Sequence, residues 1–399
     1  MTSTELSESE KAVLLSILRN PEHGDTERAS SIGINLFTFN KIKNRLSREG
    51  FIKREFVPNY GLLGFEILVA TYGTRMEPYL AEEIKKELGP NVMSKAPTHL
   101  VFFLSEPGMG VGFHVVEDFT SMKRGLIWSE KRIFNALNMD RNEMTLVPFS
   151  FKDLKVEKMF DLYNLVSNLF ALDREIPCLE PSTPGQCASG LSWAEYFEVG
   201  AKEPRVELTD VEWSLLLQLV TYPDGTDQFH VEKSGLSRYR FKRIRDRLFD
   251  LKAIKPLLIP NPFLIGLEVL IFSHMRFKPS VDAVELWNER RWEMPPNLIL
   301  TLLDRQDAIG IGLYPNLAEG SKAHNTLMNI MGRMNILEGN PHVQVFSLGN
   351  LVSDLGWPLT FGSPLMQMGK WELPADLIRW LEGISSSVQG SEHRNQRSS

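Results

Sequence analysis

The chain has 399 residues, of which 43% are hydrophobic and 24% are charged, and its formal net charge is −6. This composition is typical of a globular protein with two to four domains, and an acidic total argues against indiscriminate coating of nucleic acid. The longest apolar runs, such as residues 257–272, are broken by proline, asparagine and glutamate, so no membrane span is predicted. The N-terminus lacks a signal-peptide pattern, which favours the cytoplasm.

The two cysteines, Cys178 and Cys187, both fall in a stretch rich in proline, serine and glycine. A disulfide there would close a loop rather than support a core, and two thiols cannot complete a tetrahedral zinc site. We therefore expect reduced thiols, with no metal site and no cofactor.

In chain order, the first sixty residues predict three helices. Ser7 and Glu10 have the spacing of a capping box at a helix start, and Gly33 would end a second, short helix. The third helix carries one buried stripe, formed by Phe39, Ile42 and Leu46. Apolar runs at 51–59 and 65–73 follow, and this order is that of a winged helix-turn-helix.

The rest of this first unit predicts alternating strands and helices. The expected order is strand, helix, strand, strand, helix and strand, at 65–73, 77–88, 99–105, 110–116, 117–136 and 143–150. This β-α-β-β-α-β order is the ferredoxin-like sandwich. The fold class is therefore α+β.

The same pattern then occurs a second time. A shift of 202 positions places Gly33 on Gly235 and residues 52–68 on 254–270. A slightly smaller shift continues the match, which makes two units of roughly 150 residues. The second ferredoxin-like order is expected at 267–274, 281–290, 298–303, 308–313, 319–334 and 342–347.

These elements predict six segments along the chain. Between the units, a proline-rich linker contains "LSWAEYF", a candidate for a short docked helix, and the polar tail after residue 384 is expected to be disordered. The segments are helix-turn-helix 1 at 1–60, ferredoxin-like domain 1 at 61–171, linker at 172–206, helix-turn-helix 2 at 207–262, ferredoxin-like domain 2 at 263–350, and C-terminal extension at 351–399.

A winged helix-turn-helix that runs through a proline into a ferredoxin-like domain resembles the leucine-responsive regulator (Lrp/AsnC) family of transcription factors. The resemblance covers both units and is carried by "LSESEKAVLLSIL", "GFIKREFVPNYGLLGFE" and "AIKPLLIPNPFLIGLEV". It implies double-stranded DNA as a partner. Because family members pair through their ferredoxin-like domains, it also implies a pseudo-dimer within one chain, and further homo-oligomers stay open.

The family resemblance also implies a small-molecule effector. The family's usual glycine-plus-aspartate turn is not evident at 95–100, so no effector-site residue is assigned.

Residues 237–248 hold six cations in twelve positions, on the third helix of the second helix-turn-helix. Such a helix enters the major groove with its N-terminal half leading. The candidate DNA contacts there are Ser237, Arg238, Tyr239, Arg240, Lys242, Arg243, Arg245 and Arg247. In the first unit they are Asn35, Thr38, Asn40, Lys41, Lys43 and Arg45, with Arg54 at the wing. The alternative is a solvated helix face whose cations pair with acids elsewhere.

No catalytic motif is found, because the eight histidines are scattered and neither His-Glu-x-x-His nor Cys-x-x-Cys occurs. We therefore expect that the chain is not an enzyme. Two other classes stay open. One is a haem-precursor decarboxylase of the same layout, for which the candidate residues are His99, His114, His274 and Arg276. The other is a ligand-sensing or assembly module that does not bind DNA.

Overall fold

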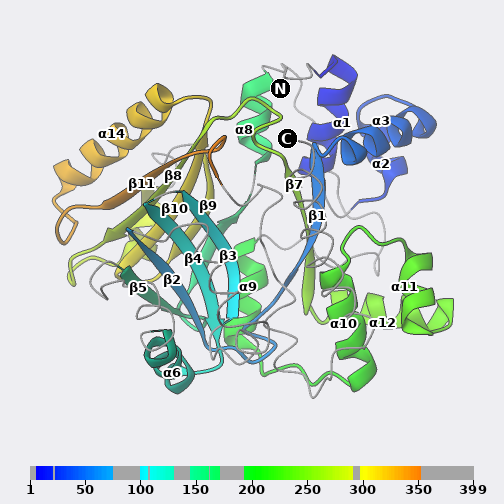
Figure 1. Ribbon diagram of the computed structural model, residues 1–399, viewed down its shortest axis with the longest axis horizontal. Coiled ribbons are helices and arrows are strands. Elements are labelled where there is room, and N and C mark those ends of the chain that lie inside the picture. The colour runs from blue at the N-terminus through cyan, green and yellow to red at the C-terminus, as the bar shows by residue number, and fades with distance from the viewer. Residues whose placement is uncertain are drawn as a thin grey trace, which may run out of the picture.

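A computed structural model of the protein describes residues 6–20, 23–74, 99–106, 108–129, 144–160, 162–170, 193–290 and 297–351. Two helical heads lie on one side of the molecule (Figure 1). Head 1 consists of α1 (Glu8–Arg19), α2 (Asp25–Ser31) and α3 (Leu36–Arg48), and head 2 consists of α10 (Asp210–Thr221), α11 (Asp227–Ser234) and α12 (Arg238–Asp250).

The two heads begin with the same cap. In head 1 the Glu10 carboxylate accepts a hydrogen bond from the backbone N–H of Ser7 at 2.9 Å, and in head 2 Glu212 does the same for Thr209 at 2.8 Å. Both bonds satisfy amides that a helix start leaves unpaired. The predicted turn is also formed, since Gly33 and Gly235 have φ of 73° and 65°, a region that side chains other than glycine avoid.

One strand from each unit forms a ribbon between the heads. Strands β1 (Ile52–Pro58) and β7 (Ile254–Pro260) pair antiparallel, with Glu55 opposite Leu257. These two residues are equivalent under the 202-residue shift, so a pseudo-twofold axis passes between them. The winged helix-turn-helix order predicted from residues 51–59 and 65–73 implies a β-ribbon formed within each unit. The structure forms it between units instead, because the second apolar run of each unit joins its ferredoxin-like sheet.

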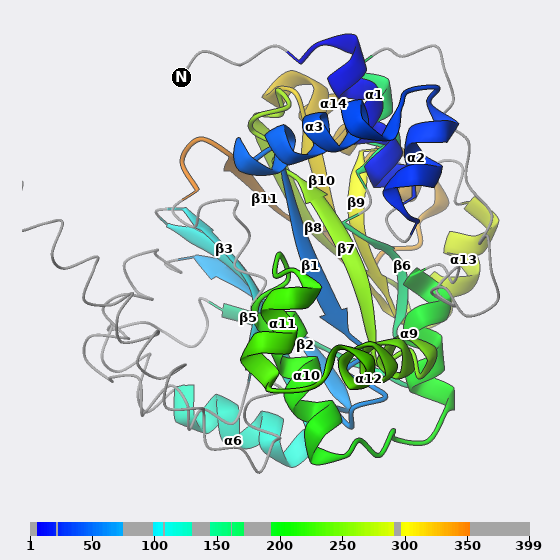
Figure 2. The same ribbon diagram turned by 90° about the vertical axis from the view of Figure 1, so that its right-hand side faces the viewer.

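The ribbon ties each head to the opposite unit. Helix α1 of head 1 packs against β7, and α10 of head 2 packs against β1. Because the strands are antiparallel, α3 and α12 end at opposite ends of the ribbon, and Figure 2 shows both helices on the same face.

Each unit contributes a ferredoxin-like sheet, and the α+β class is confirmed. Sheet 1 has the order β3-β4-β2-β5. Its strands are β2 (Ile67–Thr74), β3 (His99–Glu106), β4 (Met109–Val116) and β5 (Met144–Ser150), and α6 (Phe119–Ser129) follows β4. The start of α6 agrees with the helix predicted at 117–136. The helix predicted at 77–88 lies outside the described residues.

Sheet 2 has the order β11-β8-β10-β9-β6. Its own strands are β8 (Val269–Arg276), β9 (Leu298–Leu303), β10 (Asp307–Tyr314) and β11 (His342–Ser347), with helices α13 (Ala283–Arg290) and α14 (Leu317–Met334). The fifth strand, β6 (Lys155–Met159), follows β5 in the chain and crosses to pair with β9. This crossing was not predicted.

Between sheet 1 and head 2 in the chain, the described residues form α8 (Tyr163–Phe170), which packs against α1, and α9 (Trp193–Lys202). Helix α9 corresponds to the docked helix expected at "LSWAEYF". The buried Tyr196 hydroxyl donates to the carbonyl of Val57 at 2.8 Å, and Asn59 donates to the carbonyl of Tyr196 at 2.6 Å. Helix α9 is therefore fixed to the end of β1.

None of the described helices is long and apolar enough to cross a membrane. The two cysteines and residues 352–399, which include most of the predicted C-terminal extension, lie outside the described residues.

Candidate nucleic-acid interface

The third helix of head 2, α12, buries one stripe and exposes most of its basic residues. Phe241, Ile244 and Leu248 are buried against α10 and α11, as their spacing predicted. The N-cap residue is Ser237, whose hydroxyl accepts a hydrogen bond from the backbone N–H of Arg240 at 3.3 Å. The residues between the buried positions of the first two turns therefore face solvent.

Four cations in the first two turns of α12 are exposed: Arg238, Arg240, Lys242 and Arg243. None of them forms an ion pair with any residue that the structure describes. Tyr239 stands among them with 78% of its surface exposed. Cations without acidic partners generate a local positive potential that favours a polyanion.

The other two arginines of α12 have structural partners. Arg245 donates to both carboxylate oxygens of Asp227 at 2.7 and 2.8 Å, and Arg247 contacts Glu212 at 2.5 Å. Burial alone would raise the pKa of Glu212, but hydrogen bonds from Thr209 and the charge of Arg247 outweigh it, and the pKa lies below its ordinary value. These two arginines therefore hold α12 to its own head.

Head 1 contains the same two ion pairs at equivalent positions. Lys43 pairs with Asp25, and Arg45 pairs with Glu10. Of the residues proposed as DNA contacts, four therefore have intramolecular acidic partners, namely Lys43, Arg45, Arg245 and Arg247.

The leading half of α3 is less basic than that of α12. Asn35 is its N-cap and accepts a hydrogen bond from the backbone N–H of Thr38 at 2.8 Å. Lys41 is exposed, while Thr38 and Asn40 are half-buried. Sequence reasoning missed Phe37, which is 81% exposed at the position equivalent to Tyr239, although the 202-residue shift could have revealed the pair.

Arg54 lies in β1, within the ribbon between the heads. Its guanidinium stands 6.0 Å from the centre of the Phe56 ring, and the neighbouring Lys53 pairs with Glu55 at 2.6 Å. Arg54 is half-buried, so it offers less surface to a ligand than the cations of α12.

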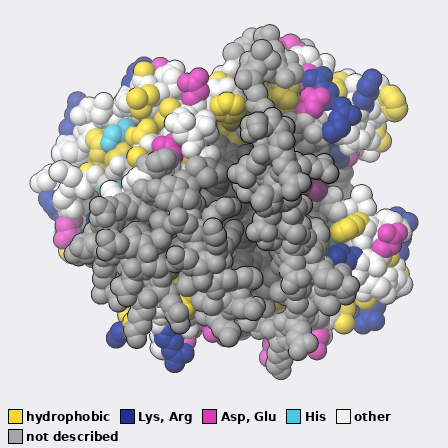
Figure 3. Space-filling model, viewed as in Figure 1, with side chains coloured by type: hydrophobic (Ala, Val, Ile, Leu, Met, Phe, Trp, Pro, Cys, Tyr) yellow, Lys and Arg dark blue, Asp and Glu magenta, His cyan; other side chains and the backbone are white. Residues whose placement is uncertain are grey.

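Helices α3 and α12 lie towards the two ends of the ribbon. Each strand of the ribbon has seven residues, a length of about 20 Å at roughly 3.3 Å per residue, and the heads lie at its two ends. Lys and Arg side chains gather over both heads along the right-hand edge of the view in Figure 3.

A second cluster of polar groups lies where the two sheets meet. The Tyr72 hydroxyl and His274 Nδ1 are 2.7 Å apart, and His274 Nε2 lies 2.8 Å from the Asp307 carboxylate. The His342 ring stacks on Tyr72 with 4.3 Å between ring centres, and burial, followed by the charge of His274, lowers the pKa of His342. Tyr72 and His274 are equivalent under the 202-residue shift, so the cluster marks the pseudo-twofold axis between the sheets.

Of the four residues considered for a decarboxylase, only His274 belongs to this cluster. Arg276 is exposed and pairs with Glu338 at 3.4 Å. In the strand register His99 is paired with Val115, and His114 is paired with Leu100. Sequence patterns did not identify the other members of the cluster, Tyr72, Asp307 and His342. Among the described residues no group of three or more metal-binding side chains is brought together.

No family model and no curated protein sequence match this chain. Two crystal structures of the siroheme decarboxylase NirDL are similar to it. One is in complex with an iron-uroporphyrin III analogue and is 10% identical with a TM-score of 0.45, covering 86% of this chain and 91% of that chain. The other is 11% identical with a TM-score of 0.45, covering 94% and 99%. A Neisseria meningitidis transcriptional regulator in complex with L-methionine is 14% identical with a TM-score of 0.29, covering 35% and 90%.

The prediction that the chain is not an enzyme is corrected by these findings. Solved structures that resemble the chain over most of its length are those of an enzyme, so the exclusion of enzymatic activity does not stand. At these identities and TM-scores, no residue role is carried from those proteins to this chain.

Proposed function

We propose that this chain is a sequence-specific DNA-binding regulator of transcription, with two helix-turn-helix heads that contact one operator. The observation that carries the proposal is the leading half of α12, where Arg238, Arg240, Lys242 and Arg243 are exposed and have no acidic partner among the described residues. A basic helix that served only to fold the head would pair its cations, as Arg245 and Arg247 do.

The position of these cations supports the same proposal. A helix-turn-helix inserts the leading half of its recognition helix into the major groove, where arginine can fork a guanine edge or a phosphate. In head 1, Asn40 suits adenine and Lys41 suits phosphate. Resemblance to the leucine-responsive regulator family agrees with this reading, and a small-molecule effector is part of it.

The proposal is tested by titrating the full chain into fluorescent 40-base-pair duplexes from a random pool, with fluorescence anisotropy as the readout. About six phosphate contacts predict that affinity falls roughly a thousandfold between 50 and 200 mM salt. Selection and sequencing of the bound duplexes should then enrich one motif. Absence of binding at 50 mM salt would contradict the proposal and favour a ligand-sensing or assembly module.

The Tyr72–His274–Asp307 chain favours a second function, the binding and decarboxylation of a tetrapyrrole. A histidine held between a phenol and a carboxylate can donate or accept a proton, and His342 adds a ring nitrogen, Nε2, that is buried without a hydrogen-bond partner among the described residues. In its N–H form, Nε2 of His342 can donate a hydrogen bond to a carboxylate of such a ligand.

This second function is tested by adding iron-uroporphyrin III to the purified chain and following its visible absorption band. Binding should shift the band, and the variant His274→Ala should lose the shift. His23→Ala, which changes a histidine in head 1, is the matched control and should keep it. An unchanged band with the wild-type chain would exclude this ligand.

A further inference from the structure

The two recognition helices expose an aromatic side chain at the same position. Phe37 is the second residue of α3 and Tyr239 is the second residue of α12, and the 202-residue shift aligns them. Their exposed fractions are 81% and 78%, the largest of any large hydrophobic residue that the structure describes. Leu36, beside Phe37, is 40% exposed.

Folding of the heads does not explain these two rings. The caps of α3 and α12 are made by Asn35 and Ser237, and the buried stripes begin two residues after the aromatics, at Phe39 and Phe241. A single exposed hydrophobic residue is common on protein surfaces. Two at one position of a duplicated element, each at the leading edge of a recognition helix, indicate a shared contact.

The neighbours of the aromatics identify the class of surface that fits them. Tyr239 is flanked by Arg238 and Arg240, and Lys41 lies one turn after Phe37. The partner must therefore combine negative charge with an apolar group that a helix can reach. The major groove of DNA combines phosphates with one such group, the C5-methyl of thymine.

We propose that Phe37 and Tyr239 each pack against a thymine methyl group in the major groove and so specify thymine at one position in each half-site. This inference rests on the proposed DNA-binding function and adds a base preference to it. The two rings differ in one respect, because Tyr239 also carries a hydroxyl that can hydrogen-bond to a phosphate. Phe37 has only its apolar ring, so head 1 depends more completely on the methyl group.

The experiment uses duplexes selected from a random pool by the full-length chain. Each thymine of the enriched motif is replaced in turn by deoxyuridine, which removes the methyl group and leaves base pairing unchanged. One thymine in each half-site should show about fourfold weaker binding after replacement, the factor expected for one buried methyl group. Other thymines should show little change.

Variants then assign each methyl group to its ring. Phe37→Ala should abolish the deoxyuridine effect in one half-site only, and Tyr239→Ala in the other only. Tyr239→Phe should keep it. Phe119→Ala removes a ring that is 65% exposed on α6, outside the heads, and is the control that should change neither effect.

The outcomes separate this inference from the proposed function. One outcome is an enriched motif in which deoxyuridine weakens the binding of wild type and of both alanine variants equally. That result would contradict the role of the rings and leave the DNA-binding function standing. Absence of any bound duplex would overturn both. Because both side chains are exposed, circular dichroism should show unchanged folding of each variant.

Discussion

The two heads have the same arrangement of helices and stabilising contacts, and they differ in the residues that their third helices expose. Both use a capping box and the same pair of ion pairs to hold the third helix, Glu10–Arg45 with Asp25–Lys43 in head 1 and Glu212–Arg247 with Asp227–Arg245 in head 2. The leading halves differ, since α12 exposes four cations there, whereas α3 exposes one, Lys41, and two apolar residues, Leu36 and Phe37. Basic residues late in these helices thus stabilise the fold, and those early in them are available to a ligand.

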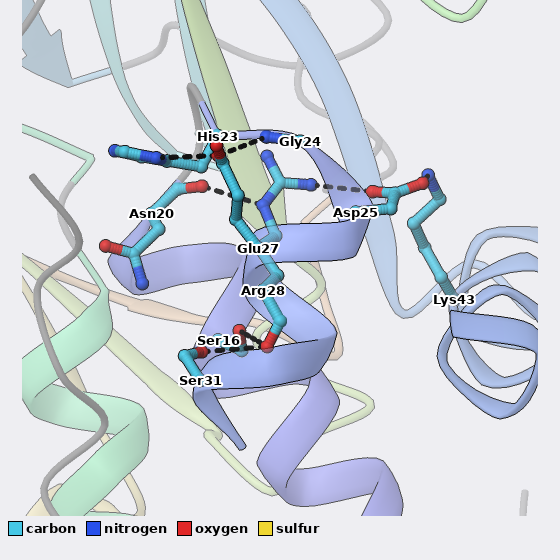
Figure 4. A network of polar contacts seen from close by, with 9 residues as sticks. All are labelled: Ser16, Asn20, His23, Gly24, Asp25, Glu27, Arg28, Ser31 and Lys43. Carbon is cyan, nitrogen blue, oxygen red and sulfur yellow. Dashed lines mark hydrogen bonds and ion pairs between the residues drawn. The ribbon is translucent and has the colours of Figure 1, made fainter. Parts of the chain in front are cut away.

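Inside the heads, one equivalent position also differs. In head 1 the buried Arg28 donates from Nε to the carbonyl of Asn20 at 2.8 Å and pairs with Asp25 at 3.1 Å (Figure 4). Burial lowers the pKa of Arg28 to about 10, so it stays charged at neutral pH. Head 2 has the buried His230 at this position, with a pKa lowered by burial. The equivalent position therefore holds Arg28, which stays charged, in head 1 and His230, which titrates, in head 2.

The largest expected effect is on DNA affinity. Replacing Arg238, Arg240 and Arg243 together with alanine should weaken binding by several kcal/mol, roughly a thousandfold, at about 1–3 kcal/mol per contact. The matched change in head 1, Thr38, Asn40 and Lys41 to alanine, should weaken it only about tenfold. Fluorescence anisotropy measures both, and thermal melting should stay nearly unchanged. Equal losses from the two heads would remove the distinction between them.

The next largest effect is on stability and distinguishes the two interiors. Arg28→Ala removes the side-chain donor to the Asn20 carbonyl and one of the two cations that pair with Asp25, and should cost about 3 kcal/mol of unfolding free energy. His230→Ala removes a ring without breaking an ion pair and should cost about 2 kcal/mol. Urea denaturation followed by circular dichroism gives both values. A smaller loss for Arg28→Ala than for His230→Ala would contradict this account.

A third prediction tests what the heads share. Glu10→Gln and Glu212→Gln should each cost about 1–2 kcal/mol at pH 7 by weakening the cap and the ion pair. The pKa of each glutamate in the folded protein is lowered from 4.5, so its charge stabilises the fold above pH 4.5 and this contribution is lost as pH falls through the lowered value. The difference in melting temperature between each variant and wild type should therefore shrink in acid. A difference that persists at pH 2 would show that the charge is not responsible.

The smallest expected effect tests the titrating group in head 2. The pKa of His230 in the folded protein lies below 6.5, so its stabilising contribution is complete above pH 6.5 and is lost as pH falls toward the lowered value. His230→Gln should reduce the loss of stability between pH 7 and pH 5 by a small amount, because it removes the group that takes up a proton in this range on unfolding. Arg28→Lys in head 1 should leave the loss unchanged. Identical pH profiles for His230→Gln and wild type would refute the assignment.

Local patterns in the sequence were sufficient to predict most of the elements. The capping box at Ser7, the turn at Gly33 and the strand expected at 298–303 were each confirmed. The predictions failed where a strand chooses a distant partner, as β1 does with β7 and β6 does with β9. Alternation within a strand reports which face is buried and carries no information about which edge it will join.

The sequence also predicted only part of the candidate site. Position on the recognition helix identified the exposed residues Arg238 and Arg240, but could not separate them from Arg247, whose acidic partner lies 35 residues earlier. The contact between Tyr72 and His274 depends on how the two sheets meet, and no local pattern encodes it. The 202-residue shift does align Tyr72 with His274, and equivalent residues can meet at a pseudo-twofold axis.

The antiparallel union of β1 and β7 has a consequence for how the protein assembles. If the two strands belonged to separate subunits, they would pair only when two chains associate, and dilution of the protein would separate them. Here both strands belong to one polypeptide, so their encounter is governed by the effective concentration that the intervening chain imposes. A single chain therefore carries both heads already joined, and the surface of one head can change in sequence without a matching change in the other.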